Sequence, residues 1–270
     1  MSVNGSIAPP SPVLLALEGR TWFELAALIP ALPALSGAPT GDGHPVLVLP
    51  GFLADDRSTR TLRWFLRHRG YHVHAWRLGR NRGPTAGTVT GLVERLEAIH
   101  RRHGRTVSIV GWSLGGIYAR ELARAFPAKV RFVITLASPF RDPLATNVAR
   151  LARFGLGQHP AGGSVPHERL RAPLPVPATS FYSETDGIVA WQSCLDEEGP
   201  HAENLAVRSS HCGMGHHPTV LLAIADRLAQ PEGSWRPFEP RSSPWWPFTP
   251  RVDARAASPP GQSVSIRPGG

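Results

Sequence analysis

Short apolar runs alternate with segments of helical periodicity through the middle of the chain. The runs are typical of strands, and they occupy residues 46–49, 71–78, 107–112, 130–136, 179–183 and 204–208. Between them, apolar residues recur every three or four positions, which predicts helices over 59–69, 88–103, 114–126 and 219–228. Runs such as 46–49 are apolar on both faces, as parallel strands are when helices cover the sheet. The pattern therefore predicts an α/β fold.

The length and the composition divide the chain into one domain with two extensions. A chain of 270 residues suits one large α/β domain, which we expect to span 44–240. The preceding extension, 1–43, has apolar segments that predict helical pieces, broken at Pro30 and Pro33, on the outside of the domain. The tail, 241–270, is rich in Pro, Trp and Arg, and we expect it to be disordered.

One turn, at residues 111–115, carries the clearest chemistry. It reads Gly-Trp-Ser-Leu-Gly, with a strand before it and a helical segment after it. A nucleophilic serine must stand clear of the sheet on strained backbone, and flanking glycines avoid clashes there. A helix that begins at Ser113 would present free N–H groups to the negative oxygen that forms in acyl transfer. We interpret Ser113 as a nucleophile and the N–H of Leu114 as an oxyanion donor; an ordinary turn is the alternative.

This strand, turn and helix resemble the nucleophile elbow of the α/β-hydrolases, nearest in style to the bacterial lipase and esterase branch. The resemblance covers about residues 44–229. It implies a mostly parallel sheet flanked by helices. It also implies a catalytic triad in the chain order serine, acid, histidine.

Two loops further along the chain supply candidates for the acid and the histidine. Asp186 stands in an Asp-Gly turn after the strand 179–183, at the sheet edge where ligands of open α/β sheets bind. The resemblance makes Asp186 the triad acid, and Asp142, which also follows a strand, is the alternative. His211 directly follows the last strand and matches the family's position for the general base, and His216 is the alternative.

The loop after the first strand reads Pro50-Gly51-Phe52. In the resembled family this loop usually reads His-Gly-x, and the N–H of the x residue is the second oxyanion donor. The resemblance therefore points to Phe52. Proline stands here in place of the histidine, which weakens the match in sequence but leaves the backbone geometry available. An ordinary turn between strand and helix is the alternative.

Residues 141–178 depart from the alternation of strands and helices, since they hold many prolines and glycines and no strand signal. Long connections without secondary structure are usually functional or disordered. In a hydrolase, an insertion at this point would lie over the active site. We expect a cap or lid, with a surface loop as the alternative.

The net charge and the lengths of the apolar runs indicate which partners and which cellular location to expect. The net charge is +9, but the arginines are scattered and match no nucleic-acid motif, so we expect no nucleic-acid partner. No apolar run approaches the roughly 20 residues needed to span a bilayer. The start also lacks the uninterrupted apolar core of a secretory signal, since Glu18, Arg20 and Glu24 interrupt it, so we expect a cytoplasmic protein. A weak lipid-interface contact through the N-terminal segment or the tail stays open.

The two cysteines and the histidines near the end of the domain raise two further questions. Cys194 follows the acid loop and Cys212 follows His211, so a disulfide between them is a hypothesis. Cys212 also lies near His211, His216 and His217, which look like metal ligands, but their spacing matches no common zinc pattern. We expect neither a metal nor an organic cofactor.

Taken together, these residues predict a serine hydrolase that cleaves carboxylic esters through an acyl-enzyme, with a small-molecule acyl ester or a lipid as substrate. An acyltransferase or a thioesterase would use the same triad, because the lid and the pocket select the leaving group and the acceptor. Both remain alternatives. A non-catalytic binding protein on the same fold is the alternative from a different class.

Overall fold

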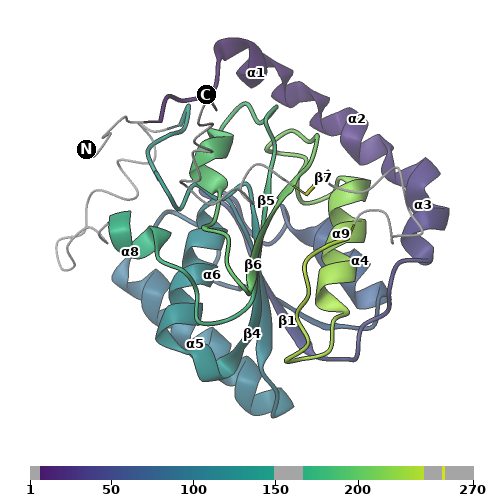
Figure 1. The fold of residues 1–270 in the computed structure, drawn as a ribbon, viewed down its shortest axis with the longest axis vertical. Coiled ribbons are helices and arrows are strands. Elements are labelled where there is room, and N and C mark those ends of the chain that lie inside the picture. Colours follow the sequence, from purple (N-terminus) through teal and green to yellow (C-terminus); the bar gives the residue numbers. More distant parts are fainter. Residues whose placement is uncertain (1–6, 149–166, 240–250, 253–270) are drawn as a thin grey trace, which may run out of the picture.

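The structure is a computed structural model that describes residues 7–148, 167–239 and 251–252. Within these residues, strands form one sheet in the order β2-β1-β3-β4-β5-β6-β7 (Figure 1). Their bounds are β1 Pro45–Leu49, β2 His72–Ala75, β3 Val107–Trp112, β4 Val130–Leu136, β5 Ala178–Tyr182, β6 Ala202–Ala206 and β7 Arg251–Val252. Neighbouring strands are parallel except for β6 and β7. The mostly parallel sheet expected from the resemblance is confirmed.

Helices cover both faces of this sheet (Figure 1). One face packs against α5 Ala86–His103, α6 Leu114–Ala125 and α8 His167–Arg171. The other face packs against α3 Leu28–Ser36, α4 Arg60–His68 and α9 Pro218–Leu228. Each face has its own apolar core, so strands such as β1 and β4 are buried along their whole length. This explains why their sequences are apolar on both faces.

Helix α5 illustrates how the sequence sets its own limits. The Thr85 side chain accepts a hydrogen bond from the N–H of Thr88 at 3.1 Å, which caps the start of the helix. Gly104 ends it with a left-handed backbone, φ 60°. The apolar positions predicted to face inward are buried: Leu92, Leu96 and Ile99.

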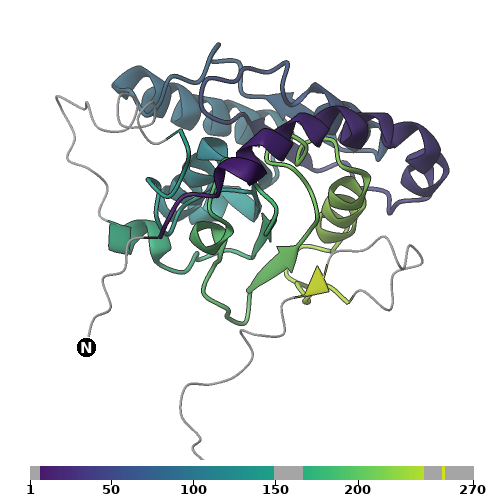
Figure 2. The ribbon, with the colours of Figure 1, turned by 90° about the horizontal axis from the view of Figure 1, so that it is seen from above.

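The N-terminal segment folds as α1 Pro12–Ala16, the 3₁₀ turn η1 Leu17–Arg20, α2 Thr21–Ala26 and then α3. Figure 2 shows these helices as one purple band across the molecule. The prediction that helices break at Pro30 and Pro33 is wrong, because α3 runs through both. Pro30 lies in the first turn, where a missing N–H costs little. Pro33 lies inside the helix and leaves the carbonyl of Ile29, a residue on the exposed side, without its helical partner.

Smaller differences concern strand β2, the insertion and the tail. β2 is shorter than the predicted 71–78. Within the insertion 141–178 the structure describes α8, while residues 149–166 lie outside the described part. In the tail it describes β7, and the rest of 241–270 lies outside as well. None of the described helices is long and apolar enough to cross a membrane.

Candidate active site

Ser113 stands at the junction of β3 and α6, where the strand ends at Trp112 and the helix begins at Leu114. Its backbone has φ 52° and ψ −120°, a conformation that residues with a side chain rarely adopt. The N–H of Ser113 donates to the carbonyl of Leu136 on β4 at 2.8 Å, which holds the turn against the sheet. The predicted strand, sharp turn and helix are therefore present.

The glycines at 111 and 115 are required by close backbone contacts. A Cβ on Gly111 would overlap the carbonyl group of Gly115, and a Cβ on Gly115 would lie 2.5 Å from the carbonyl oxygen of Leu49 on β1. Backbone atoms cannot move aside as flexible side chains do. The turn therefore tolerates only glycine at these two positions.

Asp186 and His211 meet at the carboxyl edge of the sheet, after β5 and β6 respectively. Nδ1 of His211 lies 2.7 Å from Oδ2 of Asp186. The other carboxylate oxygen, Oδ1, accepts the N–H groups of Ile188 and Val189, each at 2.8 Å. Both side chains are buried, so a carboxylate already fixed by two backbone bonds orients the imidazole ring.

The electrostatic surroundings of His211 favour its protonated form. Burial lowers the pKa of this histidine, but the charge of Asp186, the hydrogen bond to Asp186 and the charge of Glu18 outweigh that effect. The net result is a raised pKa. An imidazole with this environment accepts a proton readily and stabilises the resulting cation.

The loop of His211 packs against the residue that precedes Ser113. Nε1 of Trp112 donates to the carbonyl of His211 at 3.2 Å, and the two rings have centroids 6.5 Å apart. Within the described residues the hydroxyl of Ser113 makes no hydrogen bond, either to His211 or to another group. Hydrogen bonds of this kind are often long before substrate binds.

The loop after β1 lies beside Ser113. A Cβ built on Gly51 would be 3.2 Å from Cβ and 3.9 Å from Oγ of Ser113. In the part of the chain that the structure describes, the N–H of Phe52 donates to no other group, whereas the next N–H, from Leu53, donates to Asn81 at 2.7 Å. The N–H of Leu114 is the first of helix α6 and has no partner within the helix. Within the described residues, two N–H groups without an acceptor therefore belong to segments next to the serine.

Asn81 supports this loop, a role that the sequence did not reveal. Its side-chain amide donates to the carbonyl of Pro50 at 3.0 Å, and its Oδ1 accepts from the hydroxyl of Tyr118 and the N–H of Gly83, each at 3.2 Å. The residue is fully buried. Nothing in the sequence distinguishes it from an ordinary polar loop residue, since two of its partners, Pro50 and Tyr118, lie more than 30 positions away.

The alternative residues have other partners. Nε2 of His216 lies 3.1 Å from the carbonyl of Thr21, and Oδ1 of Asp142 accepts the N–H of Leu144 at 3.2 Å. The acid that contacts His211 is Asp186. The hypothesis of a disulfide is contradicted, because Cys194 and Cys212 are both free thiols.

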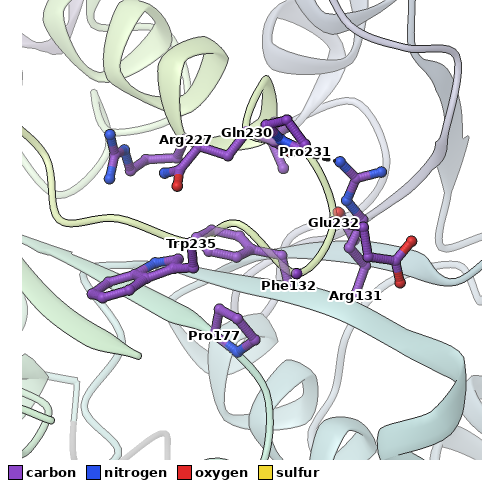
Figure 3. A pocket seen from close by; sticks show the side chains of 11 residues that line it. Arg131, Phe132, Pro177, Arg227, Gln230, Pro231, Glu232 and Trp235 are labelled. Atoms are coloured by element: carbon purple, nitrogen blue, oxygen red, sulfur yellow. Dashed lines mark hydrogen bonds between the residues drawn. The ribbon is translucent and has the colours of Figure 1, made fainter. Parts of the chain in front are cut away.

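A pocket lies at the opposite, amino-terminal edge of the sheet (Figure 3). Its volume of about 20 Å³ holds roughly one water molecule. Arg131 and Arg227 border it, and both are engaged in ion pairs with carboxylates. It is too small for an ester and does not include Ser113, Asp186 or His211. The pocket is lined by Ser108, Arg131, Phe132, Pro177, Arg227, Leu228, Gln230, Pro231, Glu232, Gly233 and Trp235.

Comparisons with known proteins agree with this architecture. The sequence profile described as the alpha/beta hydrolase family matches residues 46–269. The chain therefore belongs to the alpha/beta hydrolase family. No curated protein sequence matches it.

Solved structures of lipolytic enzymes share the fold. One is from work on LipS and LipT, two metagenome-derived lipolytic enzymes, with 18% identity and a TM-score of 0.52 over 70% of this chain and 93% of that one. Another is the mature lipase BlEst2 of Bacillus licheniformis, with 17% identity and a TM-score of 0.52 over 72% of this chain and 95% of that one. At these identities the likeness concerns the fold.

Proposed function

We propose that the protein is a serine hydrolase that cleaves carboxylic esters through an acyl-enzyme. The observation that carries the proposal is the 2.7 Å contact between Asp186 and His211, at the same sheet edge as the strained Ser113. The fold likeness to lipolytic enzymes supports an ester or a lipid as the substrate class.

The reaction begins when Oγ of Ser113 attacks the ester carbonyl carbon and Nε2 of His211 takes the hydroxyl proton. Asp186 keeps the ring in the tautomer that accepts a proton at Nε2, and it stabilises the imidazolium that results. The carbonyl oxygen becomes negative, and the N–H groups of Phe52 and Leu114 donate to it.

The intermediate then collapses and the bond to the leaving alkoxide breaks. The alkoxide takes the proton from His211 and departs as an alcohol, which leaves the acyl group on Ser113. A water molecule then attacks the acyl carbon while His211 removes a proton from that water, so the same steps occur a second time. The acid is released and Ser113 regains its proton. Apart from the ester and water, each step uses only the side chains and N–H groups named here.

The N-terminal segment bears on the form in which the substrate is presented. Its large apolar side chains are exposed, with 73% for Trp22, 79% for Phe23 and 73% for Ile29. Exposed aromatic residues are typical of surfaces that enter a lipid interface. Because α1, η1 and α2 also contact the loops of Asp186 and His211, this surface supports the choice of aggregated lipid esters over soluble ones.

Hydrolysis of a series of p-nitrophenyl esters tests the proposal. The wild type should hydrolyse them with a defined preference for chain length, and Ser113→Ala should abolish turnover while the fold is retained by circular dichroism. Added alcohols test the acyltransferase alternative, because a transferase would give the new ester in preference to the free acid. Equal rates for the wild type and Ser113→Ala would contradict the proposal.

A further inference from the structure

Two buried carboxylates of the N-terminal segment lie against the loops that carry Asp186 and His211. Glu18 belongs to η1 and Glu24 to α2, and each residue is only 9% exposed. In the sequence they look like charges that interrupt an apolar stretch. Buried carboxylates require partners, so their contacts identify what they hold.

Glu18 joins the two loops to each other. Its Oε1 accepts the N–H of Gly187, next to Asp186, at 2.8 Å and the N–H of His211 at 2.9 Å. Its Oε2 accepts the N–H of Cys212 at 3.0 Å. One side chain therefore fixes the backbone of the acid loop relative to the backbone of the histidine loop, through three charge-assisted hydrogen bonds.

Glu24 extends this network to the residues that precede His211 and Asp186 in their loops. It accepts the N–H of Ser210 at 2.7 Å and the Ser210 hydroxyl at 2.5 Å. It also pairs with Arg20 at 3.3 Å, and Arg20 donates to the carbonyl of Thr185 at 2.7 Å. The residues immediately before Asp186 and His211 are thus held by the same segment.

The two loops are shaped to receive the segment. A Cβ on Gly187 would overlap the carbonyl of Leu14, and a Cβ on Gly213 would overlap the carboxylate of Glu24. Glycine permits this close approach because it has no side chain. The contact is therefore a specific fit between the N-terminal segment and the loops.

We propose that Glu18 is a positioning residue of the active centre, which sets the placement of Asp186 and His211 through the backbone of both loops. The inference rests on the proposed function for its catalytic meaning. It makes residues 12–26, which precede the strands of the sheet, part of the catalytic unit.

The charge of Glu18 adds a second effect on the imidazole. It is among the influences that raise the pKa of His211, after Asp186. Removal of that charge should therefore lower the pKa of His211. Among the other titratable groups, Asp186 contacts the ring, Cys212 is the next residue, and Glu24, which pairs with Arg20, binds the preceding residue, Ser210. His216 and His217 follow in the same loop.

Glu18→Gln tests the inference, with Glu184→Gln as the matched control. The control removes a carboxylate that is exposed and lies in the acid loop. Glutamine keeps the shape of Glu18, but its charge is gone and one of its two terminal atoms becomes an NH₂ group, which cannot accept a hydrogen bond. We expect kcat to fall by about tenfold or more with KM little changed, since small displacements of reacting groups carry such costs. We also expect the acid limb of the kcat/KM profile to move to lower pH, while the control matches the wild type.

The readouts separate this inference from the proposed function. If the wild type is not labelled at Ser113 by a fluorophosphonate, the proposed function fails. If labelling occurs but Glu18→Gln keeps the kcat and the acid limb of the wild type, only the role of Glu18 is overturned. A lower melting temperature with unchanged kcat and unchanged pH profile would likewise overturn it, because that result describes a structural role.

A second variant covers the case in which Glu18→Gln does not fold. Glu18→Asp keeps the charge but shortens the reach, so it cannot bond all three N–H groups. We expect a lower kcat with the acid limb near that of the wild type. A kcat equal to the wild type in Glu18→Asp would overturn the inference.

Discussion

The positive φ of Ser113 costs about 1–3 kcal/mol that the surrounding structure must offset. The bond from its N–H to Leu136 and the close packing of Gly111 and Gly115 hold it in place. The strain has a consequence for chemistry, because it lifts the hydroxyl out of the sheet. There it lies beside the loop of Gly51 and the first N–H of α6.

The raised pKa of His211 predicts the pH dependence of activity. A general base must be neutral, so activity is lost as the pH falls through its pKa. Because that pKa lies above the ordinary value of 6.5, the acid limb of kcat/KM should have an apparent pKa above about 6.5. A pH profile with a p-nitrophenyl ester measures it. An acid limb below that value would contradict the assignment of His211.

Asp186→Asn should lower kcat by up to about ten-thousand-fold, as in the serine protease template, because the amide no longer selects the correct tautomer of His211. Asp142→Asn is the matched control, since Asp142 also follows a strand but bonds the N–H of Leu144. The two variants should be compared by kcat at equal folded concentration. A large loss of kcat in Asp142→Asn, with none in Asp186→Asn, would make Asp142 the triad acid in place of Asp186.

At the scale of elements, the loop after β1 depends on a residue from the loop after β2. Asn81 holds the carbonyl of Pro50 through its side chain and the N–H of Leu53 through its backbone. Among the described residues this leaves the N–H of Phe52, between them, without an acceptor, as the proposed role of an oxyanion donor requires. Asn81 therefore fixes the backbone on both sides of the Phe52 N–H.

Asn81→Ala should reduce both stability and kcat. The loss leaves buried partners without hydrogen bonds, which costs about 1–3 kcal/mol of the free energy of unfolding. We expect kcat to fall more than KM changes, because an oxyanion donor acts mainly in the transition state. Tyr118→Phe removes one contact of Asn81 and leaves the one to Pro50, so its kcat should stay near that of the wild type. Equal kcat in Asn81→Ala and the wild type would contradict a role for this loop.

The sequence predicted most strands and helices because apolar runs and helical periodicity are local signals. It placed β4 at its observed bounds and predicted the inward face of α5. It did not predict the role of Glu18, whose partner His211 is 193 positions away, or that of Asn81. Contacts of this kind depend on the folded arrangement, and a charge inside an apolar segment looks the same whether it faces water or a buried N–H. The contact of Asp186 with His211 was anticipated only through the family resemblance.

At the scale of the whole molecule, the two edges of the sheet hold different networks. The carboxyl edge carries Ser113, Asp186 and His211. The amino-terminal side carries a hydrogen-bonded chain in which Nε2 of His44 lies 2.9 Å from the Ser108 hydroxyl and Nδ1 lies 2.5 Å from Asp42, whose own side chain is about half exposed. No part of His44 or Ser108 is exposed, so a substrate cannot reach the serine or the histidine of this second set, and we interpret the set as structural.

This second network predicts how stability depends on pH. Burial and the nearby Arg131 lower the pKa of His44 to about 4, whereas the unfolded chain has the ordinary value near 6.5. Between these values the unfolded state binds the proton more readily, so stability falls as the pH is lowered from about 6.5 to about 4. At about 1.4 kcal/mol per pH unit, the loss from this group is about 3 kcal/mol.

His44→Gln should remove this contribution. Urea unfolding at about pH 7 and about pH 4 gives the difference in unfolding free energy for each protein. That difference should be smaller in the variant than in the wild type, whatever the stability of the variant at neutral pH. Equal differences would show that His44 does not carry the effect.

The most direct test of the central claim is a mass measurement of the site that a fluorophosphonate modifies. The account predicts one adduct per molecule on the peptide that contains Ser113, no adduct in Ser113→Ala, and slower labelling in His211→Gln. An adduct on a different residue, or labelling that persists at the wild-type rate in Ser113→Ala, would contradict the account.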